Sequence, residues 1–271
     1  MKKIQISRVN VSTHTHIQKT DFVAEETPLH IFLNQTHYAT ILCTPNQFRE
    51  LAIGHLMSEG ILKSVDEILE IRLENDGKCL VRLKPSIDST KRISISQPFA
   101  RVIVSACGSS DYWPLSKLID RLKLRRLEMG LTVDARIVLE SVRLLNSLAK
   151  RFRKTGGVHI AALYFASGEL AAFSEDVGRH NAVDKVIGVG AEKNLDFKCL
   201  FLTSSGRLTG DIVLKAARMR IPIVASMATA INSGVEAAQL TGLTLIGFVR
   251  GKRLNIYTYP ERVAYVSTKK L

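Results

Sequence analysis

The sequence lacks the features that define several classes of protein. Its 271 residues include only four cysteines, which lie far apart without a CxxC pair, so neither a disulfide framework nor a zinc site is indicated. No apolar run approaches the roughly 20 residues that cross a bilayer, and the first residues contain no apolar core or cleavage site. Low-complexity segments are also absent. We therefore expect a folded, cytoplasmic protein without membrane insertion, with one large or two modest domains.

Acidic residues are scarce relative to basic ones. Thirty-eight lysines and arginines outnumber 25 aspartates and glutamates, which gives a formal net charge of +13. Such an excess attracts polyanions, namely nucleic acid, an acidic protein or a phosphate-rich cofactor. The basic residues cluster only at 123–126 and 150–154, and no helix-turn-helix, zinc finger or RNP motif accompanies them. At these clusters we expect solvated faces rather than a nucleic-acid groove.

The first hundred residues predict a small α+β unit. Apolar alternation over residues 21–44, around an Asn-Gln-Thr turn, indicates a hairpin. Thr44, followed by a proline, is a plausible N-cap for a helix that starts there. A second hairpin that turns at Asp76 and Gly77, and a further strand over 91–96, complete the expected sheet.

The second half of the chain has a different pattern. Asp134 is the predicted N-cap of a long helix. From about residue 155, continuous apolar runs alternate with helical segments, which is typical of a sheet covered on both faces. The predicted fold class is therefore α/β, with an N-terminal α+β subdomain over 1–110, a basic linker over 111–133 and a three-layer α/β/α domain over 134–271.

Polar residues follow the predicted strands of this second domain, at the edge where open α/β sheets bind ligands. Each polar segment leads into a helix whose first N–H groups can bind a phosphate, while arginines add paired donors. The segments predict an anion cradle, with ordinary capping and turn roles as the alternative. For His180, a proton-carrying role and a capping role both stay open. The candidate residues are Arg179, His180, Asn181, Ser205, Gly206 and Arg207.

Cys107 is the candidate nucleophile. It ends the apolar run RVIVSAC and precedes Gly-Ser-Ser, which predicts a strand that ends in a small-residue turn with an accessible thiol. A strongly basic protein favours the thiolate, and small neighbours leave room for a partner's sulfur. Inert packing, the usual role of an isolated cysteine, is the alternative. The other three cysteines have strand-like flanks that favour packing.

Several sequence blocks, spread over almost the whole chain, carry a family resemblance. The most specific is EDVGRHNAVDKVIG at residues 175–188. The others are TGGVHIAA at 155–162, SGR at 205–207, LTLIGFVR at 243–250, NIY at 255–257, ETPL at 26–29, TP at 44–45 and LAIGHLMSEG at 51–60. Together they resemble the FdhD family of formate dehydrogenase accessory sulfurtransferases.

The resemblance implies a function and a set of partners. Proteins of this family accept persulfide sulfur from a cysteine desulfurase and pass it to a bis(molybdopterin guanine dinucleotide) molybdenum cofactor, which then enters formate dehydrogenase. By resemblance we expect that molybdenum or tungsten cofactor as bound substrate, GDP-like nucleotides at the same site, a homodimer and a domain similar in fold to cytidine deaminases. The family's loop is Cys-Gly-x-Cys, whereas here Ser110 replaces the second cysteine, which leaves Cys107 as the only carrier.

The resemblance also assigns a second cofactor-binding segment. This segment follows the last apolar strand and contains an aromatic ring for base stacking and three cations for a diphosphate, with a basic hairpin tip as the alternative. Its residues are Phe248, Val249, Arg250, Gly251, Lys252 and Arg253.

Sulfur transfer is thus the leading hypothesis, and two other functions stay open. The first is a non-catalytic chaperone that binds the cofactor and the apo-dehydrogenase. The second is a nucleotide- or RNA-binding protein that uses the same basic surface. Zinc-dependent deamination is disfavoured because it requires a His-x-Glu motif and a pair of closely spaced cysteines. Here no glutamate lies two positions after His159, and no paired cysteines follow. We predict no metal site of the protein's own.

Overall fold

The computed structural model describes residues 1–102 and 115–265 of the chain. The strands of its central sheet are β8 (His159–Phe165), β9 (Leu170–Asp176), β10 (Leu200–Ser204), β11 (Ile223–Ser226), β12 (Thr244–Arg250) and β13 (Arg253–Ile256). They lie in the order β13-β12-β11-β10-β8-β9. The middle strands β10, β11 and β12 are parallel, whereas β8, β9 and β13 pair antiparallel with their neighbours.

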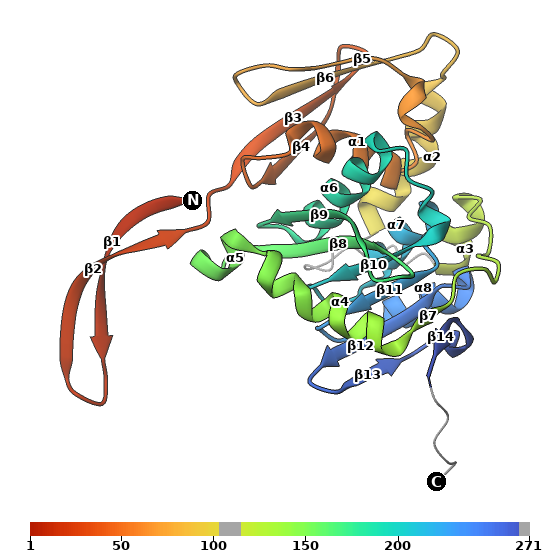
Figure 1. Cartoon of the computed structure of the whole chain (residues 1–271). Coiled ribbons are helices and arrows are strands. Elements are labelled where there is room, and N and C mark those ends of the chain that lie inside the picture. The colour runs from red at the N-terminus through yellow and green to blue at the C-terminus, as the bar shows by residue number, and fades with distance from the viewer. Residues whose placement is uncertain (103–114, 266–271) are drawn as a thin grey trace.

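Helices cover both faces of this sheet and give it three layers (Figure 1). The covering helices are α4 (Ala135–Leu148) on one face and α6 (Arg179–Glu192), α7 (Gly210–Arg218) and α8 (Asn232–Thr241) on the other. Successive strand residues point to opposite faces, so that Phe201 packs in the core under α4 and Leu202 packs in the core under the other helices. The predicted α/β fold class is confirmed.

The N-terminal part forms a second sheet and a buried helix. These elements are β3 (Thr27–Leu33), β4 (Thr36–Cys43), β5 (Ile68–Leu73), β6 (Lys78–Leu83) and α1 (Phe48–Ser58). The strand order is β4-β3-β6-β5, and both predicted hairpins are confirmed. The domain boundaries near residues 110 and 133 stay a prediction.

Helix α1 lies directly against α6 because glycines remove the side chains between the two backbones. A Cβ atom on Gly54 would lie 1.7 Å from the Asp184 carbonyl oxygen, and one on Gly188 would lie 1.9 Å from the Glu50 carbonyl oxygen. Only glycine permits so close an approach. The two parts of the chain therefore share one apolar core across this helix pair.

A hairpin at the N-terminus extends away from the rest of the molecule (Figure 1). The sequence analysis did not predict it. Its strands are β1 (Lys2–Asn10) and β2 (Thr15–Val23), which pair antiparallel. The base of the hairpin meets α5 (Lys150–Thr155), where the Lys154 ammonium lies 5.5 Å from the centre of the Phe22 ring. Most of its residues are exposed.

Short elements complete the fold. They are the 3₁₀ turns η1 (Val65–Glu67), η2 (Phe197–Cys199) and η3 (Pro260–Arg262), the helix α3 (Leu115–Arg121), and the strands β7 (Val133–Asp134) and β14 (Val263–Ala264). The predicted N-cap at Asp134 is confirmed, because its carboxylate accepts a hydrogen bond from the Arg136 N–H at 2.7 Å. The long helix predicted after it is divided at Ala149 into α4 and α5. Within the described residues, no helix is long and apolar enough to cross a bilayer.

The prediction that Thr44 caps the first helix was wrong. Helix α1 begins at Phe48, and its N-cap is Gln47 in a left-handed conformation. Thr44 is buried, and its hydroxyl accepts a hydrogen bond from the Val177 N–H at 3.0 Å. A contact with a residue far along the chain therefore uses the oxygen that would otherwise cap the helix.

The prediction of a strand over residues 91–96 was also wrong. These residues belong to helix α2 (Ser89–Val102). The Asp88 carboxylate accepts a hydrogen bond from the Lys91 N–H at 2.9 Å, which stabilises the first turn. Arg92 then binds both carboxylate oxygens of Glu67, at 2.6 and 2.9 Å. A strand was likewise expected up to Cys107, but its first two residues are helical, and residues 103–114 lie outside the described part.

Candidate functional site

The ends of the central strands bring the sequence-predicted loops to one edge of the sheet. Strands β9, β10, β11 and β12 all end at this edge, and β8 begins there because it is antiparallel to β9 and β10. We call this edge the carboxyl edge. It comprises residues 176–181, 204–210, 226–233 and 248–253, together with His159.

Three helices begin at the carboxyl edge, each directly after a strand. Their N-caps are Gly178 for α6, Thr209 for α7 and Ile231 for α8, and none of these residues makes a side-chain capping hydrogen bond within the described chain. At α4, in contrast, Asp134 supplies such a bond. At α7, however, the Gly210 N–H donates to the Ser233 hydroxyl at 3.2 Å, and the Asp211 carboxylate lies in the first turn. The N-termini of α6 and α8 present N–H groups and a partial positive charge. The carboxyl edge is therefore suited to an anion.

Arg179 lies at the centre of this arrangement. Its side-chain stem packs on Gly206, where a Cβ atom would lie 2.9 Å from the Arg179 Cβ atom. The Arg179 Nε atom is buried and has no hydrogen-bond partner among the described residues. A buried N–H group without a partner costs about 1–3 kcal/mol, more when it is charged. An anionic ligand is one group that would satisfy it.

His159 lies where the charged side chains of the carboxyl edge come together. Burial lowers the pKa of His159 below its usual value of 6.5. The neighbouring Arg179, His180 and Arg207 lower the pKa further, and only Asp176 opposes them. The structure thus places three of the predicted residues around one histidine that sequence reasoning missed as a site residue. In the sequence, His159 is marked by its position as the first residue of an apolar run. This position indicates a site residue only once β8 is known to be antiparallel.

Ser205 connects this histidine to the neighbouring strand. Its hydroxyl oxygen accepts a hydrogen bond from the Ile160 N–H at 3.0 Å and lies 3.3 Å from the His159 Nδ1 atom. Gly206, the next residue, accepts a hydrogen bond on its carbonyl oxygen from the Ser226 hydroxyl at 2.7 Å. The turn after β10 is therefore held from both sides. These bonds fix the turn that carries Arg207, whose own side chain is exposed.

His180 and Asn181 both hold neighbouring elements in place. The His180 Nε2 atom contacts the Asp211 carboxylate, which also accepts a hydrogen bond from the Thr209 hydroxyl. Burial raises the pKa of Asp211, but the bonds from His180 and Thr209 outweigh it, so the pKa lies below its usual range. This pair joins the first turns of α6 and α7. Whether His180 also carries a proton stays open.

The Asn181 amide group donates two hydrogen bonds to protein oxygens. One goes to the Leu42 carbonyl oxygen at 2.8 Å and the other to the Asp176 carboxylate at 2.9 Å. The same carboxylate binds the Lys185 ammonium at 2.6 Å and the Thr44 N–H at 3.0 Å. Asn181 therefore ties the N-terminal sheet to the carboxyl edge, and its predicted contact with a cofactor stays a prediction.

The predicted segment 248–253 comprises the end of β12 and the turn into β13, and it lies at the same edge, two strands from β10. Phe248 has a positive φ of 51° where the pairing of β12 with β13 shifts register, and its N–H donates to the Ala228 carbonyl oxygen at 2.9 Å. Val249 is buried, and the Arg250 guanidinium lies 4.7 Å from the centre of the Phe248 ring. Gly251 and Lys252 form the exposed turn before β13. With β11 between them, β12 and β10 are about 10 Å apart, close enough for one extended ligand to reach both.

The sequence over residues 24–264 matches the model of the FdhD/NarQ family. The chain belongs to this family. A sulfur carrier protein FdhD from Sulfolobus acidocaldarius is 37% identical over 97% of the chain and 98% of its own length. One from Methanothermobacter thermautotrophicus is 36% identical over 89% of the chain and 91% of its length. The crystal structure of a formate dehydrogenase accessory protein from Desulfotalea psychrophila is similar with a TM-score of 0.77 and 26% identity, covering 97% of this chain and 99% of that one.

The described cysteines of this family member differ in accessibility. Burial raises the pKa of Cys43 to about 12, and the nearby Lys185 only partly opposes it. Burial also raises the pKa of Cys79 to about 12. Cys199 is exposed, and its Sγ atom lies 3.7 Å from the Asp196 carboxylate. Cys107 and Ser110 lie outside the described residues. In the part of the chain that the structure describes, no group of three potential metal ligands comes together.

Proposed function

We propose that this chain is a sulfur carrier for formate dehydrogenase maturation. The Cys107 thiolate attacks the outer sulfur of a cysteine desulfurase persulfide and releases the desulfurase thiolate. The resulting Cys107 persulfide passes its terminal sulfur to a molybdenum or tungsten cofactor held as substrate at the carboxyl edge. Cys107 leaves as the thiolate, and the metal, bound in a reduced state, supplies the two electrons with which the transferred sulfur becomes a sulfido ligand. The cofactor is a bis(molybdopterin guanine dinucleotide), and the apo-dehydrogenase receives it afterwards. Membership of the FdhD/NarQ family and the sulfur carrier names of the relatives support this proposal. The proposal also includes assembly of the chain as a homodimer.

The observation that carries the proposal is the convergence of anion-binding groups at the carboxyl edge. The N-termini of α6 and α8 and the Arg207 side chain supply donors for a diphosphate. The buried Arg179 Nε atom is a further donor that needs an acceptor. Phe248 and Arg250 stack on each other about 10 Å from β10, and they supply a surface for a guanine base. Diphosphate and base together are the recognition elements of a guanine nucleotide.

The sulfur-carrying role of Cys107 is supported by the state of the other thiols. A persulfide carrier attacks as the thiolate, and a raised pKa makes Cys43 and Cys79 poor nucleophiles at neutral pH. Cys199 is exposed, and its Sγ atom is engaged with the Asp196 carboxylate at 3.7 Å. Cys107 remains as the thiol within a small-residue segment of a strongly basic chain.

Replacement of Cys107 tests the proposal. We expect Cys107→Ser to abolish restoration of formate dehydrogenase activity in cells that lack their own accessory protein. The exposed Cys199→Ser is the matched control and should leave restoration unchanged. Mass spectrometry after incubation with a cysteine desulfurase and cysteine should detect a persulfide on Cys107. Full restoration by Cys107→Ser would refute single-cysteine transfer.

Ser110 favours a second candidate function, a cofactor-binding chaperone. The family's loop has two cysteines, and a chain with one cannot exchange or resolve a persulfide within that loop. Under this alternative the chain binds the cofactor and the apo-dehydrogenase without carrying sulfur. Persulfide detection separates the two functions: the chaperone predicts GDP binding, as a probe for the cofactor, together with an unmodified Cys107.

A further inference from the structure

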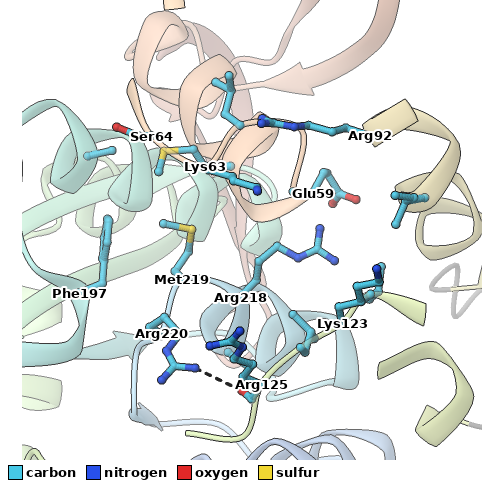
Figure 2. A pocket seen from close by; sticks show the side chains of 18 of the residues that line it. Glu59, Lys63, Ser64, Arg92, Lys123, Arg125, Phe197, Arg218, Met219 and Arg220 are labelled. Atoms are coloured by element: carbon cyan, nitrogen blue, oxygen red, sulfur yellow. Dashed lines mark hydrogen bonds between the residues drawn. The ribbon is translucent and has the colours of Figure 1, made fainter. Parts of the chain in front are cut away.

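A large cleft lies at the edge of the central sheet opposite the carboxyl edge. It has a volume of about 1080 Å³ and opens between the N-terminal part, the segment that follows α3, and the ends of α6 and α7 (Figure 2). None of the predicted cofactor-binding residues lines it. The proposed sulfur carrier function therefore leaves this cleft without an assigned role.

Basic side chains from separate elements meet in this cleft. Eight lysines and arginines line it, against only two acidic residues, Glu59 and Asp88. Figure 2 shows Lys63, Arg218 and Lys123 reaching toward the same space from different sides. The two carboxylates already have partners, since Glu59 binds the buried Lys215 at 3.1 Å and Asp88 caps α2. The cleft therefore has an excess of positive charge.

Burial disfavours the charged form of one of these cations, Arg218. Arg218 is half-buried at the end of α7, and its guanidinium lies so close to Gly60 that a Cβ atom there would be 2.1 Å from it. Burial lowers the pKa of Arg218, and the charge of Glu59 opposes this shift. A carboxylate entering the cleft would oppose it further, because a nearby negative charge stabilises a cation that has lost part of its hydration.

The backbone groups around the cleft disfavour a compact phosphate. Helices α1, α6 and α7 end here, with C-caps at Glu59, Lys193 and Met219. Helix C-termini carry a partial negative charge and present carbonyl oxygens rather than N–H donors. An anion is therefore bound by the ends of long side chains, spread over the width of the cleft, and not by a backbone cradle. This arrangement suits several separate carboxylates.

Apolar side chains form the floor between the cations. The buried Met57, Leu62, Phe197 and Met219 all line the cleft. A ligand that fills this space therefore combines negative charges with apolar groups. Methionine adapts its shape to different apolar partners, which is common at surfaces that bind peptides.

We propose that this cleft is a docking site for an acidic segment of a partner protein that carries apolar side chains among its glutamates or aspartates. Charge complementarity selects this occupant over a neutral peptide, and the apolar floor selects it over a free phosphate compound. The cluster Lys123 and Arg125, which the sequence predicted only as a solvated face, gains a function as one wall of the site. The proposal does not depend on sulfur transfer.

A labelled peptide tests the site on the full-length protein. The probe is a short peptide rich in glutamate and leucine, followed by fluorescence anisotropy at low and physiological salt. We expect the double variant Lys123→Glu and Arg125→Glu to weaken binding at least tenfold at low salt. Lys91→Glu, on the opposite wall, should weaken it severalfold and serves as a second variant should the first fold poorly.

The controls address net charge and ligand class. Arg143→Glu with Lys150→Glu makes the same change in net charge on exposed residues of α4 and α5, and should alter binding less than about threefold. GDP binding should stay unchanged in every variant, which shows that the fold and the carboxyl edge are intact. Equal weakening by both double variants would attribute binding to net charge and overturn the proposal. So would equal binding of a peptide with glutamine in place of glutamate, or binding of inorganic tripolyphosphate but not of the peptide.

Discussion

The two edges of the central sheet supply positive charge by opposite means. At the carboxyl edge, α6, α7 and α8 begin, so that the backbone itself contributes positive potential. At the opposite edge, α1, α6 and α7 end, and the positive charge comes only from lysine and arginine side chains. The same helices thus present a rigid donor surface at one end and a flexible cationic surface at the other.

This difference determines which kind of ligand each edge can recognise. Backbone N–H groups have fixed positions, so they recognise a ligand of defined shape such as a nucleotide diphosphate. Long side chains adapt, so they recognise charge distributed along a flexible chain. The two proposed ligands, an acidic peptide segment and a guanine nucleotide cofactor, would therefore bind to one chain without competing. The following predictions separate the two edges and test what holds them together.

The largest effect is expected where the helices that span both edges are joined. Between the edges, the buried Lys215 ammonium lies 2.8 and 2.9 Å from the two oxygens of Asp184 and 2.9 Å from the Ser58 hydroxyl. The variant Lys215→Met keeps the apolar stem but leaves Asp184 and Glu59 buried without their cation. We expect it to lower the free energy of unfolding by about 3–5 kcal/mol, measured by urea denaturation. The exposed Lys198→Met should change it by less than about 0.5 kcal/mol.

The pH dependence of stability gives this prediction a sharper form. Burial raises the pKa of Asp184, but Lys215 and His55 outweigh it, so the pKa lies below its usual range. Such a carboxyl stabilises the fold at a pH above its unfolded pKa of about 3.9, and this contribution is lost as the pH falls through the folded pKa. In Lys215→Met the Asp184 pKa should rise, so that the stability lost at neutral pH is partly regained in acid. Parallel stability curves for the variant and the parent would contradict this account.

Whether a feature could be predicted from the sequence depends on whether the contacts that decide it are local or long-range. The central strands were predicted because buried parallel strands are continuous apolar runs, and Asp134 was recognised because its capping bond is local. The helix over 91–96 was missed because Ile93 and Ile95 alternate with the strand period of two, and the deciding contact joins Arg92 to Glu67, far back in the chain. The same reason applies to Thr44, whose partner Val177 lies in another part of the fold.

The site was predicted in its outline but not in its full membership. Arg179, Gly206 and Arg207 follow strands, and a general rule for α/β sheets places them at one edge. His159 begins a strand rather than following one, so only the antiparallel pairing of β8 with β10 brings it to Ser205. The cleft at the other edge could not be predicted, because its walls come from five separate segments that share no motif.

An intermediate effect is expected from an exposed arginine of the carboxyl edge. Arg207→Ala should weaken GDP binding about tenfold to hundredfold at low salt, since a hydrogen bond to a charged group contributes about 1.5–3 kcal/mol. Calorimetric titration measures this change. The equally exposed Arg143→Ala on α4 should leave the affinity for GDP unaltered, as should Lys123→Glu with Arg125→Glu. Loss of GDP binding in the latter variant would mean that the two edges are one site.

The smallest effect is a change in the titration of His159, which reports charge at the carboxyl edge alone. Burial and the neighbouring Arg179, His180 and Arg207 lower its pKa below the usual value of 6.5. A bound diphosphate would offset these charges, and we expect GDP to raise the His159 pKa. Arg207→Ala should raise it in the unliganded protein for the same reason. Nuclear magnetic resonance of the histidine ring measures both shifts, with His37 on the N-terminal sheet as an internal control. A His159 pKa that responds to the acidic peptide but not to GDP would reverse the assignment of ligands to the two edges.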